Sequence, residues 1–269
     1  MAWSNVGSLK GAKGEAGTVT PAAAIADLTA APTAGDFNAL LEALRAAGLM
    51  DRPTPAPPVQ TEAVDVFIGD STTAIWDTAP VDKNWTTLIA NADGVGSVNV
   101  AVVGAGFQNG ADKKHSLPDQ VTTAIGKTQG KTVRRVFLVG VWNDQPYIES
   151  DFDAEKAAMT KTATMIKAAW PGAQMIYIPE VAPQTPYSKS MVEKFSIAID
   201  QVYALFEGNG FNVSRDWFDW LPDGEANGYM YDSMHPNAKA MNVAAHKIRE
   251  WVNTLSGPRI DGEIPAWSE

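Results

Sequence analysis

Ser71, Asp232 and His235 have the side chains that nucleophilic catalysis requires. Asp232 stands three residues before His235 on one expected tight turn, so its carboxylate can hold the imidazole by a hydrogen bond and stabilise its charged form. Ser71 closes the tripeptide Gly69-Asp70-Ser71, directly after a β-rich run, where we expect its hydroxyl to be exposed at the start of a helix. Taken alone, a serine that merely caps that helix is the simpler interpretation.

Two further positions have donors suited to an oxyanion. Gly104 lies in Val103-Gly104-Ala105-Gly106, where a glycine backbone N–H can approach a ligand closely, although Gly106 competes for this role. Asn143 follows the next β-rich run, and its carboxamide can donate to an oxyanion, although Asn-Asp is also a common turn pair. The amide of Ser71 itself is the third candidate donor.

Short β-rich runs alternate with helical stretches along the chain after residue 60. The expected strands are 64–68, 98–103, 133–139, 174–178 and, less regularly, 211–214. The expected helices lie near 84–92, 117–127, 153–169, 190–208 and 237–255. This order predicts βαβ units and a parallel sheet covered by helices on both faces, with the functional crevice beyond the carboxyl ends of the strands.

Gly69-Asp70-Ser71, Gly104, Asn143 and Asp232-x-x-His235-Pro236 together resemble the four sequence blocks of the SGNH hydrolases, also called GDSL-like lipases and esterases. The resemblance covers residues 64–255. It implies a three-layer, flavodoxin-like α/β fold in which Ser71 is the nucleophile, His235 the base and Asp232 its orienting partner. It also implies an oxyanion hole made by the amides of Ser71 and Gly104 and the side chain of Asn143. The third block of the family is usually Gly-x-Asn-Asp, whereas here Val141 stands two residues before Asn143 and the glycine is Gly140.

Four residues beside these motifs are expected to line a substrate cleft: Asp70, Trp76, Phe107 and Trp142. Aromatic residues so close to a sheet belong to the core just as often. His115 and His246 are interpreted as an exposed loop residue and a residue on a helix face. With three widely spaced His and no Cys, no metal site and no cofactor are expected.

Charge and composition exclude several other functions. The chain of 269 residues has 21 Lys and Arg against 31 Asp and Glu, a net charge of −10, which argues against binding nucleic acid or docking on an anionic membrane. No apolar run approaches the roughly 20 residues of a membrane span, and the N-terminus lacks the pattern of a signal peptide.

The first sixty residues have a different character. Glycines at 11, 14 and 17 have the period of a collagen-like triple helix, with a flexible arm as the alternative. A helix with Phe37 and Leu40 on one face follows, and prolines at 53, 55, 57 and 58 indicate a semi-rigid spacer. We therefore divide the chain into an anchoring or oligomerising stem (1–50), a linker (51–60), a hydrolase domain (61–256) and a C-terminal tail (257–269).

The stem resembles, in composition, the anchoring regions of actinobacterial phage tail or head-fibre proteins. This resemblance implies a virion-displayed esterase that attaches to other virion proteins through residues 1–50, self-associates, most simply as a trimer, and cleaves an ester of a host-envelope glycan or lipid. A bacterial esterase, secreted or cytoplasmic, is the next choice. A virion structural or receptor-binding module with the same fold but little catalysis is the alternative from another class.

Overall fold

The chain, described here from a computed structural model, forms two compact units, Met1–Gln60 and Thr61–Glu269. The structure describes residues 33–46, 62–108 and 115–268. In the first unit these include helix α1 (Ala34–Ala46), on which Phe37 and Leu40 are exposed. The glycine repeat and the proline-rich linker lie outside the described residues. None of the helices described here is both long and apolar enough to cross a membrane.

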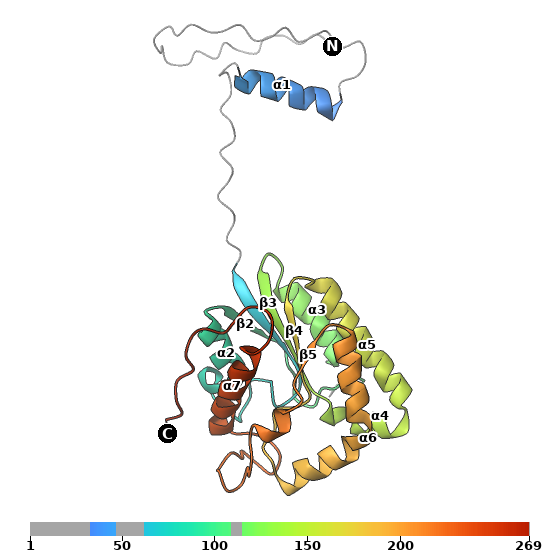
Figure 1. Cartoon of the computed structure of the whole chain (residues 1–269), viewed down its shortest axis with the longest axis vertical. Coiled ribbons are helices and arrows are strands. Elements are labelled where there is room, and N and C mark those ends of the chain that lie inside the picture. The colour runs from blue at the N-terminus through green and yellow to red at the C-terminus, as the bar shows by residue number, and fades with distance from the viewer. Residues whose placement is uncertain (1–32, 47–61, 109–114, 269) are drawn as a thin grey trace. The chain divides into compact units, whose positions relative to one another are not determined.

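The second unit is built on a five-stranded parallel sheet with the strand order β2-β1-β3-β4-β5 (Figure 1). The strands are β1 (Ala63–Ile68), β2 (Gly96–Asn99), β3 (Thr132–Val139), β4 (Gln174–Ile178) and β5 (Asn212–Val213). Since β1 lies between β2 and β3, the strand order reverses direction there. In open α/β sheets such a reversal opens a crevice at the carboxyl ends of the strands.

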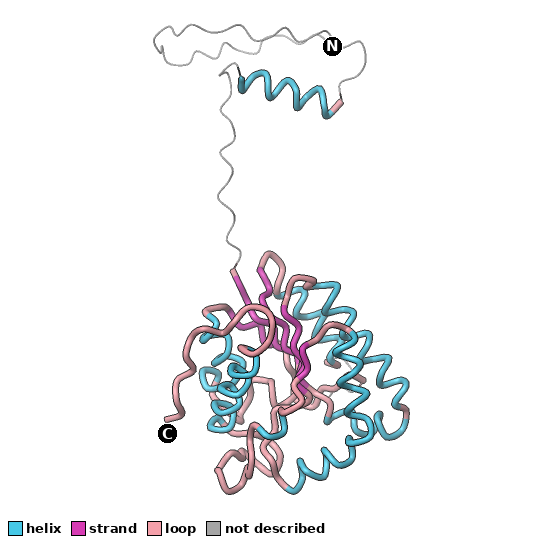
Figure 2. The backbone as a smooth tube through the Cα atoms, viewed as in Figure 1, coloured by secondary structure: helices cyan, strands magenta, loops and turns pink. Residues whose placement is uncertain are grey.

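Helices cover both faces of this sheet, which gives the three-layer α/β fold that the sequence predicted (Figures 1 and 2). Helix α2 (Trp85–Asp93) packs against α7 (Ala238–Val252) in one layer. Helices α3 (Leu117–Lys127), α5 (Phe152–Ala169) and α6 (Pro186–Gly208) pack side by side in the other, and the short α4 (Gln145–Ser150) precedes α5.

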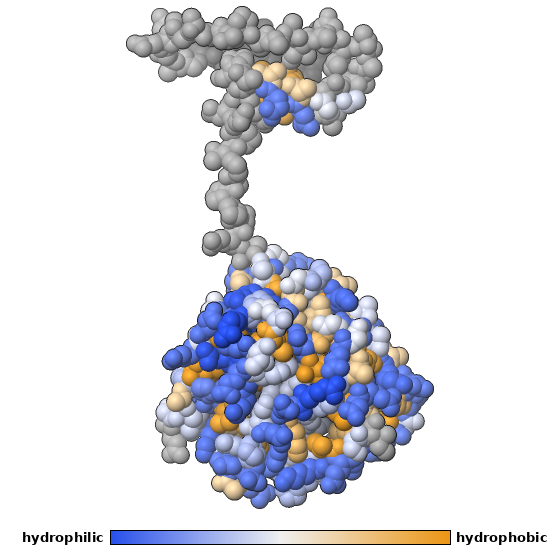
Figure 3. Space-filling model, in the orientation of Figure 1, coloured by the Kyte–Doolittle hydropathy of each residue, from blue (hydrophilic) through white to orange (hydrophobic). Residues whose placement is uncertain are grey.

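Aromatic side chains fill the core between the layers. Phe67 of β1 stacks on Phe137 of β3 with ring centroids 5.0 Å apart, and Trp85 meets Phe67 edge-on. Tyr177 of β4 stacks on Phe206 of α6 at 3.9 Å. These buried runs explain why the strands read as continuous apolar segments. On the face of this unit seen in Figure 3, hydrophilic residues cover most of the surface and apolar patches are scattered.

Among the expected boundaries that differ from the structure, two have a clear local cause. The second strand was expected over 98–103, but β2 ends at Asn99, whose side chain accepts a hydrogen bond from the Ala101 amide and turns the chain. The last helix was expected from 237, but Asn237 is the N-cap and α7 begins at Ala238. Pro236 therefore precedes the helix and does not start it.

The C-terminal tail belongs to the domain, contrary to the boundary that we drew at 256. Ile260 and Ile264 are buried, and the Gly262 amide donates to the Ala92 carbonyl at 2.9 Å. The buried guanidinium of Arg135 donates to the Pro258 carbonyl and pairs with the Asp93 carboxylate. The tail thus supplies both apolar cover and an acceptor that a buried cation needs.

Candidate active site

The structure brings Ser71, His235 and Asp232 into one hydrogen-bonded line, although Ser71 is 164 residues from His235. The Nε2 atom of His235 lies 3.1 Å from the Ser71 Oγ atom, and its Nδ1 atom lies 2.8 Å from Oδ2 of Asp232. Nucleophile, base and orienting carboxylate therefore stand at the distances that proton transfer from a serine hydroxyl requires.

Ser71 occupies a turn beyond the end of β1, and the expected helix does not form there. Four side chains donate to the four successive carbonyls of residues 71–74. The donors are Trp76 to Ser71, Trp85 to Thr72, Asn99 to Thr73 and Asn84 to Ala74. Because these carbonyls are taken by side chains, the turn is fixed without continuing into helical bonds.

Gly69 is required by close packing between the end of β1 and its surroundings. A Cβ atom at Gly69 would lie 2.7 Å from the Thr73 hydroxyl oxygen and 2.9 Å from the Val139 carbonyl oxygen. The strand end and the nucleophile turn can approach this closely only without a side chain at residue 69.

His235 is held by a second tight turn. The Oδ1 atom of Asp232 accepts hydrogen bonds from the amides of Met234 and His235, at 2.7 and 2.8 Å. Partial burial acts to raise the pKa of Asp232, but the hydrogen bonds from the side chain and amide of His235 outweigh it and lower the pKa to about 2. Asp232 is therefore ionised at any pH near neutrality and can stabilise the imidazolium that forms during catalysis.

The expected oxyanion donors surround Ser71. Gly104 has a φ of +76° in the turn that follows β2, a conformation that favours glycine. Within the described part of the chain, the amides of Ser71 and Gly104 donate to no protein acceptor. Both are therefore available to a substrate.

Asn143 bridges the two turns that carry these amides. Its Nδ2 atom donates to the Ala105 carbonyl at 2.9 Å and to Oδ2 of Asp70 at 3.2 Å. The bond to Asp70 is the longer, and Asp70 also accepts from the amide and hydroxyl of Thr72. The Nδ2 proton that Asn143 donates to Asp70 is therefore the one that it can donate to an oxyanion instead.

The displaced glycine of the third block has a conformational explanation. Gly140 has a φ of +136°, and its carbonyl accepts a hydrogen bond from the Tyr177 hydroxyl at 3.2 Å. Val141 has a φ of −164° and a ψ of −20°, which lies outside the left-handed region that favours glycine, and its side chain is buried. The position with a positive φ is therefore residue 140, one residue earlier than the glycine of the family's Gly-x-Asn-Asp block, and Asn143 keeps its place in that block.

Gly106, the competitor of Gly104, is accounted for by a buried carboxylate. A Cβ atom at Gly106 would clash with the carboxylate of Asp144, which accepts hydrogen bonds from the amides of Phe107 and Gln108 at 2.7 and 3.2 Å. This network anchors the segment after Gly104 to the residue that follows Asn143. Gly106 is thus needed for packing, which leaves Gly104 as the oxyanion candidate.

Glu155 on α5 completes this network and provides a test of it. Burial, followed by repulsion from Asp144, raises the pKa of Glu155 to about 8. The folded state then holds a proton that the unfolded state releases above its ordinary pKa, so stability falls as the pH rises from about 4.5 towards 8. Glu155→Gln should remove this dependence. The Tm of the variant minus the Tm of the parent protein should therefore increase by about 5 °C between pH 5 and pH 8.

The exposed Asp153 is the matched control on the same helix. Lys156 lowers its pKa by a hydrogen bond, so Asp153→Asn should give a Tm difference that is constant above pH 5. The measurement is thermal unfolding of the three proteins across the pH range. A constant difference for Glu155→Gln as well would contradict the assignment of a protonated Glu155.

Beneath the nucleophile turn lies a pair of buried carboxyl groups that the sequence did not reveal as a pair. Burial raises the pKa of Asp70, and burial and then repulsion from Asp70 raise that of Glu180 well above its ordinary value. The Thr72 hydroxyl contacts a carboxyl oxygen of each. We assign the shared proton to Glu180, so that Asp70 bears the charge of the pair. Asp70 was expected to line a substrate cleft. It is instead buried beneath the nucleophile turn and stabilises that turn from within.

Of the three aromatic cleft candidates, only Trp76 lies at the site. Its ring meets that of His235 edge-on, with centroids 4.8 Å apart. Phe107 is buried against Phe206, and Trp142 is buried near Trp217, so both belong to the core. Each of these two rings also lies near an aromatic ring of α6, Phe107 near Phe206 and Trp142 near Tyr187.

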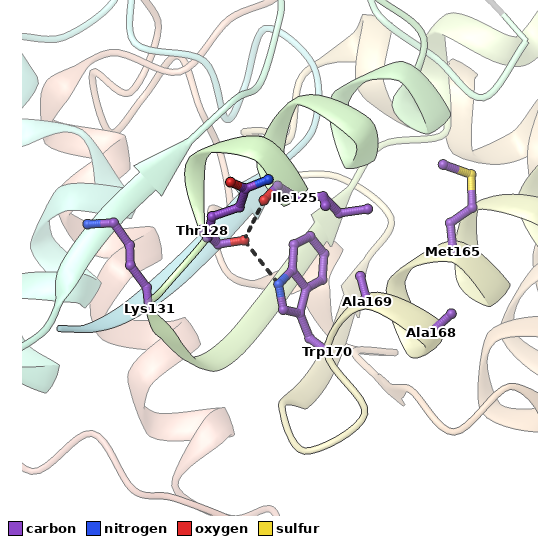
Figure 4. A pocket seen from close by; sticks show the side chains of 8 residues that line it. Ile125, Thr128, Lys131, Met165, Ala168, Ala169 and Trp170 are labelled. Carbon is purple, nitrogen blue, oxygen red and sulfur yellow. Dashed lines mark hydrogen bonds between the residues drawn. The ribbon is translucent and has the colours of Figure 1, made fainter. Parts of the chain in front are cut away.

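The other histidines stay apart from this site. His115 is exposed before α3, and His246 is half-buried on α7. No cluster of potential metal ligands occurs among residues 33–46, 62–108 and 115–268. A hollow of about 540 Å³ lies between the ends of α3 and α5, beside Trp170 and Lys131 (Figure 4). Lys131 immediately precedes β3, whereas Ser71 follows the parallel strand β1. This hollow therefore lies at the amino ends of the strands, on the opposite side of the sheet from Ser71.

Comparisons with known proteins identify the family and the fold of this chain. The sequence profile of the GDSL-like Lipase/Acylhydrolase family matches residues 67–243. Curated protein sequences give no match. Among solved structures, a carbohydrate acetylesterase from Sinorhizobium meliloti is similar, with 17% identity, a TM-score of 0.54 and coverage of 72% of this chain and 99% of that chain.

Two other solved structures are similar over the same share of this chain. A member of the lipolytic G-D-S-L family from Veillonella parvula has 17% identity and a TM-score of 0.51, and 100% of that chain is covered. The inhibitor-bound aryl esterase of M. smegmatis has 14% identity and a TM-score of 0.51, and 99% of that chain is covered. At these identities the likeness shows the fold.

Proposed function

The chain belongs to the GDSL-like lipase/acylhydrolase family of ester-cleaving hydrolases, and we propose that it is a serine esterase working through an acyl-enzyme on Ser71. The observation that carries this proposal is the line from Ser71 Oγ through His235 to Asp232, with gaps of 3.1 and 2.8 Å. The two unpaired amides beside it supply the charge stabilisation that ester cleavage needs.

In the first half of the reaction, Ser71 Oγ attacks the carbonyl carbon of the ester and its proton passes to Nε2 of His235. The oxyanion that forms accepts hydrogen bonds from the amides of Ser71 and Gly104 and from Asn143. The bond to the alcohol oxygen then breaks, and His235 gives its proton to the leaving alcohol. A water molecule repeats these steps on the acyl-Ser71 ester and releases the carboxylic acid.

Asn143→Ala tests the oxyanion hole. Removing one such donor lowers kcat by roughly 10²–10³, and we expect this fall with little change in KM because the bond forms in the transition state. Asn212 is a matched control, since Asn212→Ala also removes a half-buried carboxamide that donates to a main-chain carbonyl, that of Met175. An Asn143→Ala variant whose kcat is unchanged, or no lower than that of Asn212→Ala, would rule out this role.

As substrate we propose an O-acetyl or lipid acyl ester of a host cell envelope. The proposal is supported by family membership and by the similar carbohydrate acetylesterase and aryl esterase. Hydrolysis should be screened over p-nitrophenyl esters of increasing acyl length and over acetylated cell-wall polysaccharides. Turnover of the polysaccharides supports an envelope substrate. Turnover of the small esters alone contradicts it, and no turnover at all favours a structural module.

We propose further that residues 1–50 attach the enzyme to a virion and promote self-association. The support is the glycine period at 11, 14 and 17 and the exposed apolar side chains of α1. Light scattering should give an oligomer for the full chain and a monomer for residues 61–269, with equal esterase activity per chain. A full chain that is monomeric and binds no virion protein would overturn this proposal.

A further inference from the structure

The aromatic rings of Trp76 and Tyr231 extend from His235, the general base of the triad, towards the solvent. The Trp76 ring stands 4.8 Å from the His235 ring, and the Tyr231 ring stands 5.8 Å from that of Trp76, at 69° to it. Tyr231 is 48% exposed, although it lies next to Asp232. Trp76 is fixed in place because its indole N–H donates to the Ser71 carbonyl at 2.7 Å. Trp76 is therefore a fixed surface directly beside the reacting groups, and the Tyr231 ring extends this surface towards the solvent.

Several exposed apolar side chains are close in the sequence to the site residues. Of the nine large hydrophobic side chains exposed within residues 33–46, 62–108 and 115–268, four lie within four sequence positions of Ser71, Gly104 or His235. These four are Ile75, Val103, Tyr231 and Met234. Exposed apolar groups gathered at a catalytic centre are typical of a ligand-binding surface.

The reaction determines which part of an ester meets the two rings. His235 must deliver its proton to the oxygen of the leaving alcohol, so the alcohol lies on the His235 side of Ser71. The carbonyl oxygen points to the amides of Ser71 and Gly104, and the acyl group takes the remaining direction. Since Trp76 and Tyr231 flank His235, they face the alcohol half.

We propose that Trp76 and Tyr231 form a binding platform for the alcohol half of the ester and select an alcohol that carries a ring with an apolar face. Rings of this kind, whether aryl or pyranose, pack on aromatic side chains, whereas a short open-chain alcohol covers little of the platform. The inference rests on the proposed esterase function and specifies its substrate class.

Tyr231 is the residue to vary, because Trp76 also holds the Ser71 carbonyl. With the full-length protein, Tyr231→Ala should lower kcat/KM about 3- to 10-fold for phenyl acetate and for a mono-acetylated methyl pyranoside. For ethyl acetate the change should be less than about 2-fold, because an ethyl group covers little aromatic area. Tyr231→Phe should restore most of the loss, because the ring and not the hydroxyl makes the contact.

Tyr187 supplies the control for residue type and exposure, since it is 42% exposed and its ring lies near Trp142. Tyr187→Ala should leave the ratio of phenyl acetate to ethyl acetate hydrolysis unchanged. A loss confined to phenyl acetate would identify an aryl alcohol, and one confined to the pyranoside a sugar. Equal losses for all three esters in Tyr231→Ala, or a changed preference between p-nitrophenyl acetate and butyrate, would overturn the platform.

These outcomes are separate from a failure of the proposed function. If the parent protein hydrolyses none of the esters, the esterase proposal fails, and the platform fails with it as a specificity device. If the parent protein is active and the three esters respond alike to Tyr231→Ala, the esterase stands and the platform alone is wrong.

Discussion

Replacing Ser71 by Ala is expected to remove nearly all ester hydrolysis, with a fall in kcat of about 10⁴–10⁶-fold. The Ser71 Oγ atom lies 3.1 Å from His235 Nε2 and is the atom that would form the acyl-enzyme. The fold should be unchanged, because side-chain donors to the carbonyls of residues 71–74 fix the nucleophile turn independently of this hydroxyl. Initial rates on p-nitrophenyl acetate and thermal unfolding together measure both effects.

Ser214 is the matched control for this substitution. Ser214 is buried, and its Oγ atom has no hydrogen-bond partner among the residues that the structure describes, so Ser214→Ala also removes a buried hydroxyl near the end of a strand. It should leave kcat within about 2-fold, as substitutions away from the reacting groups do. Retained activity in Ser71→Ala, with the Tm unchanged, would exclude Ser71 as the nucleophile.

Replacing His235 by Ala is expected to cost about as much as replacing Ser71, because serine without its base is a weak nucleophile at neutral pH. The double variant Ser71→Ala/His235→Ala should be no less active than either single variant, since residues that act as one unit are strongly non-additive. Measuring kcat for the three proteins completes the cycle. His246→Ala, which alters a half-buried histidine on α7, should retain full activity.

An additive result would contradict this account. If the double variant loses the product of the two single effects, Ser71 and His235 act in separate steps, and the 3.1 Å contact between them is not catalytic.

The sequence sufficed for the fold because the strands are continuous apolar runs that alternate with helical patterns. The expected run at 174–178 coincides with β4. The same logic located Ser71 and Asn143 each directly after a strand, β1 and β3, and parallel strands bring their carboxyl ends to one edge of the sheet. Asp232 and His235 are linked within one turn, so their pairing was also a local property.

What the sequence did not show depends on contacts between distant segments. The nucleophile turn is fixed by Trp85 and Asn99, and the acid pair joins Asp70 to a residue 110 positions away, Glu180. No local pattern indicates such partners. Phe107 and Trp142 follow motif residues closely, yet both are buried, because burial is decided by the helices that pack over the strand ends.

The central claim, that Ser71 is the nucleophile of an active triad, is tested most directly by covalent labelling. A serine-directed organophosphonate should add one equivalent to the native protein, and peptide mass spectrometry should place the adduct on Ser71 with simultaneous loss of esterase activity. His235→Ala should label far more slowly, because the hydroxyl lacks its base. Labelling of another serine, or activity that survives full modification of Ser71, would contradict the account.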